Sequence, residues 1–106
     1  MSNQQWQLVK EHFSQERQYI DGFYYRLRTL AEDEYELAVI HGGVCGENIY
    51  HPRMKVKETK GMLVPLSMYD HYSFPVVNLS YEDAPERLTD ELQSLLQQFL
   101  QAKELI

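Results

Sequence analysis

The clearest pattern of apolar and polar positions lies at the C-terminal end, from Ser80 to Ile106. Apolar residues recur there at the three- and four-residue spacing of one buried helical face: Leu88, Leu92, Leu95, Leu96, Phe99 and Ala102. Asp83 is suited to cap the helix, and Pro85 is tolerated in a first turn, where no intrahelical N–H bond is lost. The segment therefore predicts an amphipathic helix that needs a surface to pack on.

The N-terminal third has apolar residues at intervals of seven, as in a long helix: Trp6, Phe13, Ile20 and Leu27. A competing interpretation divides this segment, because Asp21-Gly22 is a common turn dipeptide and aromatic residues after it favour a strand. We expect a helix from Asn3 to Gln18. For Phe23–Leu30, helix and strand both stay open.

The middle of the chain predicts strands. Tyr35–His41 is apolar on both faces, as in a central strand that is covered on each side. After it, Val44–Pro52 predicts a loop with a short extended piece.

Met54 and Val56 alternate with Arg53, Lys55 and Lys57, which suits a half-exposed strand. Further on we expect a hairpin turn at Thr59-Lys60-Gly61 and a strand at Met62–Leu66, which Pro65 limits to an edge or an end of the sheet. An aromatic loop at Ser67–Phe74 and a short strand at Pro75–Ser80 follow. The order of elements predicts an α+β fold, in which an N-terminal helix, a mainly antiparallel sheet of three or four strands and a C-terminal amphipathic helix form one domain over residues 1–106.

Composition narrows the classes of function. The net charge of −6 disfavours nonspecific binding to nucleic acid, whose phosphates require a positive surface. No stretch approaches the roughly 20 apolar residues of a membrane span, and no signal peptide is recognisable. With one cysteine, no intrachain disulfide can form. We expect a cytoplasmic protein with no cofactor, for which a homodimer is possible.

Side chains with potential chemistry are concentrated in the glycine-containing segment from His41 to His51. Cys45 with His41, His51 and His71 could supply four zinc ligands, although the spacing matches no common zinc signature. Cys45 could also act as a nucleophile with a histidine as its base. A small metal- or Cys/His-dependent enzyme centred on this segment is therefore the alternative hypothesis.

Features that suggest binding are stronger. The chain has 8 tyrosines and 4 phenylalanines, and tyrosine provides large contact area at low entropic cost. The candidates for a protein-binding surface are Tyr69, His71, Tyr72, Phe74, Tyr24 and Tyr25. A basic run, Arg53, Lys55, Lys57 and Lys60, would line one strand face, but no aromatic residues alternate within it as an RNA-binding strip requires.

In size, charge and order of elements the chain is similar to small acidic secretion chaperones and to small immunity-type inhibitor proteins, which act by covering a partner. We therefore favour a noncatalytic protein-binding role, as a chaperone, adaptor or inhibitor, over catalysis.

Overall fold

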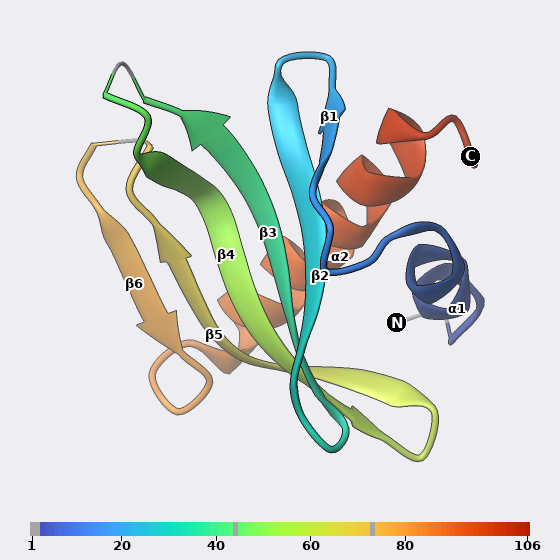
Figure 1. Cartoon of the computed structure of the whole chain (residues 1–106). Helices are drawn as coiled ribbons and strands as arrows, with labels where there is room; N and C mark the ends of the chain where they lie inside the picture. Colours follow the sequence, from blue (N-terminus) through green and yellow to red (C-terminus); the bar gives the residue numbers. More distant parts are fainter. Residues whose placement is uncertain (1–2, 44, 73) are drawn as a thin grey trace.

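The computed structural model describes residues 3–43, 45–72 and 74–106. Two helices flank a series of strands (Figure 1). In chain order the elements are α1 (Asn3–His12), β1 (Gln18–Ile20), β2 (Phe23–Ala31), β3 (Glu34–Gly42), β4 (Asn48–Thr59), β5 (Met62–Asp70), β6 (Val77–Ser80) and α2 (Pro85–Ala102).

The strands form one antiparallel meander in which each strand pairs with its neighbours along the chain, in the order β1-β2-β3-β4-β5-β6. In Figure 1, α2 lies behind the sheet and α1 lies to the right of it, where Trp6 and Val9 of α1 join the same core cluster as the apolar face of α2. The structure confirms the α+β class and the two terminal helices. The expected number of three or four strands was too low, because the sheet has six.

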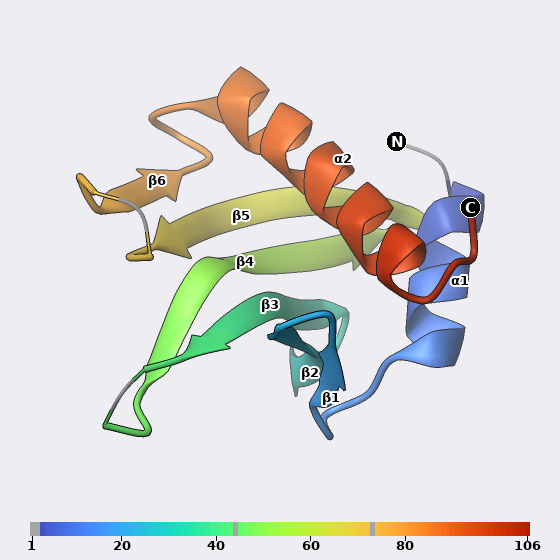
Figure 2. The same cartoon turned by 90° about the horizontal axis from the view of Figure 1, so that it is seen from above.

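The core lies between α2 and the covered side of the sheet, with α1 closing one end (Figure 2). The predicted apolar face of α2 is confirmed, since Leu88, Leu92, Leu96 and Phe99 are all 0% exposed. Every second residue of the strands packs against this face of α2. In the central strands β3 and β4 these residues are Leu37, Val39, Met54 and Val56. Burial of these side chains supplies the main favourable free energy of folding.

The prediction of an N-terminal helix from Asn3 to Gln18 is wrong beyond His12, where α1 ends. Asp21 and Gly22 adopt φ angles of 51° and 96° and form the tight turn of the β1–β2 hairpin. Beyond the turn, Tyr25 and Leu27 alternate into the core with the two-residue period of a strand. The seven-residue spacing of the apolar residues was therefore compatible with a helix followed by a hairpin.

The strands β4 and β5 extend further than the sequence indicates. β4 begins at Asn48, in a segment expected to be mostly loop, and β5 continues to Asp70, through half of the predicted aromatic loop. Pro65 lies inside β5, but β6 pairs only with the later part of that strand, from Ser67 to Asp70, so Pro65 has β4 alone as its strand neighbour and the expectation of an edge position holds locally. The pairing shifts beside both Pro65 and Pro52, and such bulges accommodate a residue that has no N–H.

The beginning of α2 differs in detail from the predicted cap. Ala84 is the N-cap residue and makes no side-chain capping bond, whereas the carboxylate of Asp83 accepts a hydrogen bond from Ser80 Oγ at 2.8 Å. Pro85 is in the first turn, as predicted.

We expect Leu96→Ala to lower the free energy of unfolding by about 2–5 kcal/mol, because Leu96 is fully buried and its loss leaves a cavity. Urea denaturation followed by circular dichroism measures this change. Gln97→Ala, one position further along α2 and exposed, is the matched control and should change stability by less than about 0.5 kcal/mol. Equal effects of the two substitutions would contradict the position of this core.

Candidate binding surface

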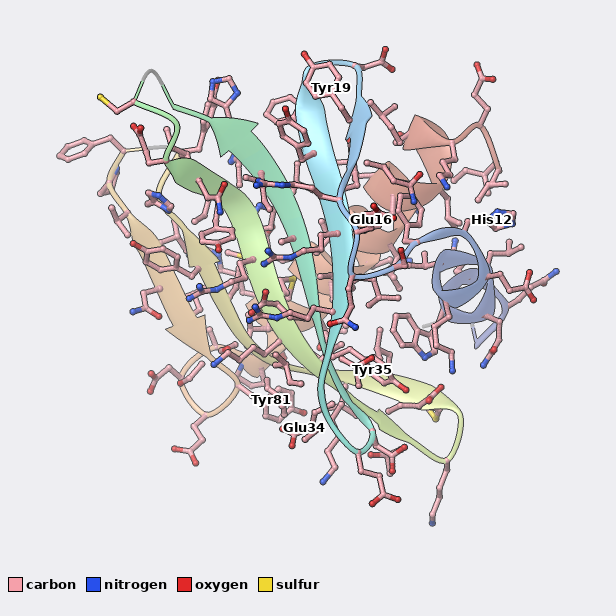
Figure 3. The ribbon with its side chains drawn as sticks, viewed as in Figure 1. His12, Glu16, Tyr19, Glu34, Tyr35 and Tyr81 are labelled. Carbon is pink, nitrogen blue, oxygen red and sulfur yellow. The ribbon has the colours of Figure 1, made fainter. Side chains whose placement is uncertain are left out.

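The side of the sheet that faces away from the helices, which we call the open face, is formed by the residues that alternate with core positions. The strand register places Arg26, Ala38, Arg53 and Tyr69 in one row across β2 to β5. The adjacent rows contain Tyr24, Ile40 and Tyr50 on one side and Arg28, Glu36, Lys55 and Ser67 on the other. In Figure 3 this face is turned toward the viewer, and nitrogen-tipped side chains stand over its middle.

Ala38 and Ile40 are 0% exposed although they lie on the open face and outside the main core cluster. Their register neighbours are long side chains: Arg26 and Arg53 for Ala38, and the two tyrosines of the next row for Ile40. The central strand is therefore covered on both sides, as its apolar pattern predicts. On the open face the cover consists of arginine stems and tyrosine rings, which carry apolar surface beneath their polar ends.

Glu36 is the electrostatic centre of the open face. Its side chain is 2% exposed and is surrounded by guanidinium groups. Arg26 Nη2 lies 2.8 Å from Oε1, Arg28 Nη2 lies 3.3 Å from Oε2, and Arg53 Nε lies 4.0 Å from Oε2. A carboxylate this deeply buried requires such partners, because its desolvation is otherwise unfavourable.

Arg53 also stacks on the aromatic residues beside it. Its guanidinium lies 4.8 Å from the ring centre of Tyr50 and 5.2 Å from that of Tyr69. His71 closes the group, with ring centroids 5.8 Å from Tyr50 and 5.1 Å from Tyr69. Toward the β1 edge of the sheet, the guanidinium of Arg17 lies 5.1 Å from the ring centre of Tyr24. These cation–π and ring contacts fix the orientation of side chains that would otherwise be mobile.

A second cluster lies on the helix side of the sheet. His51 Nδ1 is 2.8 Å from Asp70 Oδ2, and Asp70 Oδ1 accepts a hydrogen bond from the backbone N–H of Tyr72. The Tyr72 ring contacts both His51, at 4.5 Å, and His41, at 5.0 Å. A carboxylate that orients an imidazole is half of an acid–base arrangement. Among the described residues, no Ser, Thr or Cys side chain makes a hydrogen bond to His51.

Cys45 lies in the loop between β3 and β4, and its side chain is exposed. The backbone N–H of Cys45 donates to Glu47 Oε2 at 3.0 Å, so a side-chain carboxylate already occupies an amide that an oxyanion hole would need. A Cβ at Gly43 would overlap the Glu47 carboxylate in this arrangement, so a side chain there would displace that carboxylate from the Cys45 amide.

The structure thus divides the residues of the proposed Cys/His centre. His41 and His51 share the ring of Tyr72, whereas His71 belongs to the open face with Tyr50 and Tyr69. Within residues 3–43, 45–72 and 74–106, no group of three or more His, Cys, Asp and Glu side chains is placed to hold a metal ion.

The six candidate binding residues fall into three environments. Tyr24, Tyr69 and His71 lie on the open face. Tyr72 joins the second cluster and Phe74 is 96% exposed, while Tyr25 is only 6% exposed and packs in the core against Phe13 and Phe99. Tyr25 therefore presents almost no surface to a partner.

Sequence reasoning missed Arg26, Arg28 and Glu36 as a unit. The signal was nevertheless present: two arginines two positions apart precede the turn at Glu32-Asp33, and glutamates two positions apart follow it. In a hairpin, this spacing puts opposite charges on the same face of adjacent strands.

Comparison with known proteins adds no resemblance: no family model matches the chain, and neither a curated protein nor a solved structure matches it at a significant level. In the part of the chain that the structure describes, neither helix combines the length and the apolar character needed to cross a membrane.

We expect Glu36→Gln to lower the free energy of unfolding by about 2–4 kcal/mol, since it removes the charge that compensates the buried Arg26 and leaves the shape unchanged. Urea denaturation measures the change, with the exposed Glu86→Gln as the matched control. A Glu36→Gln protein as stable as the control would show that the carboxylate does not hold the arginines.

Proposed function

We propose that this protein is a noncatalytic protein-binding protein, acting as a chaperone, adaptor or inhibitor, and that its open face is the surface that contacts the partner. The observation that carries the proposal is the construction of this face. It is a packed layer of arginine and tyrosine side chains over Ala38 and Ile40, and neither helix of the described residues covers it.

The composition of this face supports the proposal. Tyrosine and arginine are enriched at interfaces and among the residues whose removal weakens binding most. Here Tyr50, Tyr69 and Arg53 hold one another in place through stacking contacts. A surface ordered before the partner arrives loses less side-chain entropy on binding, which favours affinity.

The Cys/His-dependent enzyme is less well supported. The contact that favours it is the one between His51 and Asp70, which orients a half-exposed imidazole. No described hydrogen bond joins Cys45 to a histidine, and the described backbone amide contact of Cys45 goes to Glu47. An acid–base role for His51 would therefore need a reacting group from a substrate.

A photo-crosslinking residue in place of Lys55, which is exposed on the open face, should capture one specific protein in the native host. The same residue in place of Gln97, exposed on α2, is the matched control and should not capture that protein. Mass spectrometry of the crosslinked product identifies the partner. Capture from Gln97 but not from Lys55 would contradict the assignment of the open face.

With the captured partner in hand, Tyr69→Ala should weaken its affinity at least about tenfold, because it removes a central ring and one side of the Arg53 stack. Isothermal titration calorimetry measures the dissociation constant. Tyr81→Ala is the control, since Tyr81 is 45% exposed but lies beside Pro85 and Thr89 of α2. Equal affinities for the Tyr69→Ala and wild-type proteins would exclude this part of the face from the interface.

A further inference from the structure

The charges of the chain are distributed unevenly around the sheet. The three rows of the open face contain four cations, Arg26, Arg28, Arg53 and Lys55, and one carboxylate, that of Glu36. They give these rows a net charge of +3, and subtracting it from the total of −6 leaves −9 for the rest of the chain. A positive patch on an otherwise acidic protein selects a partner of opposite charge at that patch.

We propose that the open face takes an acidic segment of the partner protein, whose carboxylates lie against Arg28, Arg53 and Lys55. The inference rests on the proposed function and names the chemistry of the partner. Arg28 and Arg53 side chains remain 44% and 33% exposed, whereas Glu36 between them is only 2% exposed. The cations are therefore accessible to a ligand, while the carboxylate that orders them is not.

Glu36 positions Arg26, Arg28 and Arg53 without neutralising all three. One carboxylate contacts three guanidinium groups, and the buried Nε of Arg26 has no hydrogen-bond partner among the described residues. A buried donor without a partner is unfavourable, so the cluster is not arranged for stability alone. An additional carboxylate at the exposed ends of Arg28 and Arg53 would offset charge that Glu36 leaves uncompensated.

The dimensions of the patch set the length of the segment. From β2 to β5 the row of Arg26, Ala38, Arg53 and Tyr69 crosses three strand spacings. At about 4.8 Å each these amount to roughly 14 Å, which about four residues of an extended peptide would span. A short acidic stretch of about this length fits across the row.

Two other occupants fit less well. A second copy docked face to face would oppose two patches of equal positive charge. Single-stranded nucleic acid needs free aromatic faces for its bases, but Arg53 already covers Tyr50 and Tyr69, and Arg17 covers Tyr24. Glu34 lies at the end of the sheet opposite Tyr19 (Figure 3), where it would repel a phosphate backbone that runs on along β3.

Fluorescence anisotropy with labelled hexaglutamate, hexaserine and hexauridylate tests the inference. We expect hexaglutamate to bind and hexaserine not to bind, with affinity falling between about 0.05 and 0.5 M NaCl as salt screens the charges. Arg53→Gln and Lys55→Gln should each weaken hexaglutamate binding at least about threefold. Arg87→Gln is the matched control, because Arg87 is exposed on α2, and it should have no effect. Tighter binding of hexauridylate, or equal binding of the two peptides, would overturn the inference.

The captured partner separates failure of this inference from failure of the proposed function. Suppose that the photo-crosslinking residue in place of Lys55 captures a partner, and that the affinity of this partner for the protein changes neither with salt nor with Arg53→Gln. The open face is then an interface, but its partner does not present an acidic segment there. If the Lys55 position captures no protein, the proposed function itself fails. A circular dichroism spectrum that matches the wild-type spectrum shows, for each variant, that a loss of binding is not a loss of fold.

Discussion

The packing of α2 on a single side of the sheet is the constraint on which the rest of the structure depends. Its apolar residues, Leu88, Leu92, Leu96 and Phe99, are entirely used in covering that side. The part of the chain that the structure describes has no further helix for the other side, yet β3 is apolar in both directions. Ala38 and Ile40 must therefore be covered by side chains of the sheet itself, and arginine and tyrosine are long enough to lie across neighbouring strands.

The ionic cluster around Glu36 shows how this self-made cover differs from an ordinary core. A buried ion pair is often no more stable than apolar residues of the same volume, because both charges lose their hydration. An apolar layer on the open face would, however, form a large exposed patch that invites association without selectivity. Arginines held by Glu36, together with rings held by Arg53, cover the strand and still present a polar outer surface.

Patterns local to one element were predictable, and patterns that depend on register were not. The apolar stripe of α2 and the turn at Lys60-Gly61 follow from neighbours along the chain, and both are present, with φ angles of 54° and 77° at the turn. The predicted helix was wrong beyond His12 because Phe13 and Leu27, two steps of seven residues apart, enter the same core from the segment after α1 and from β2.

The same limit applies to the candidate site. Tyr24 and Tyr25 are adjacent in sequence, and only the pairing of β2 with β3 determines which one faces the core. The bulges beside Pro52 and Pro65 shift that alternation along β4 and β5, and the prolines alone do not say how far the register shifts. The contact of His71 with Tyr50 joins two strands and depends on these shifts, so it could not be predicted from spacing.

The meander has a consequence for the order in which the nascent chain matures. Every strand pairs with the one made just before it, so hairpins can assemble in step with synthesis, N-terminus first. The open face has all of its rows once β5 has emerged from the ribosome. The opposite side must wait for residues 85–102, and until then Leu37, Val39 and Met54 are accessible to holdases and to other unfinished chains. Synthesis thus completes the residues of the polar side before the helix that protects the apolar side.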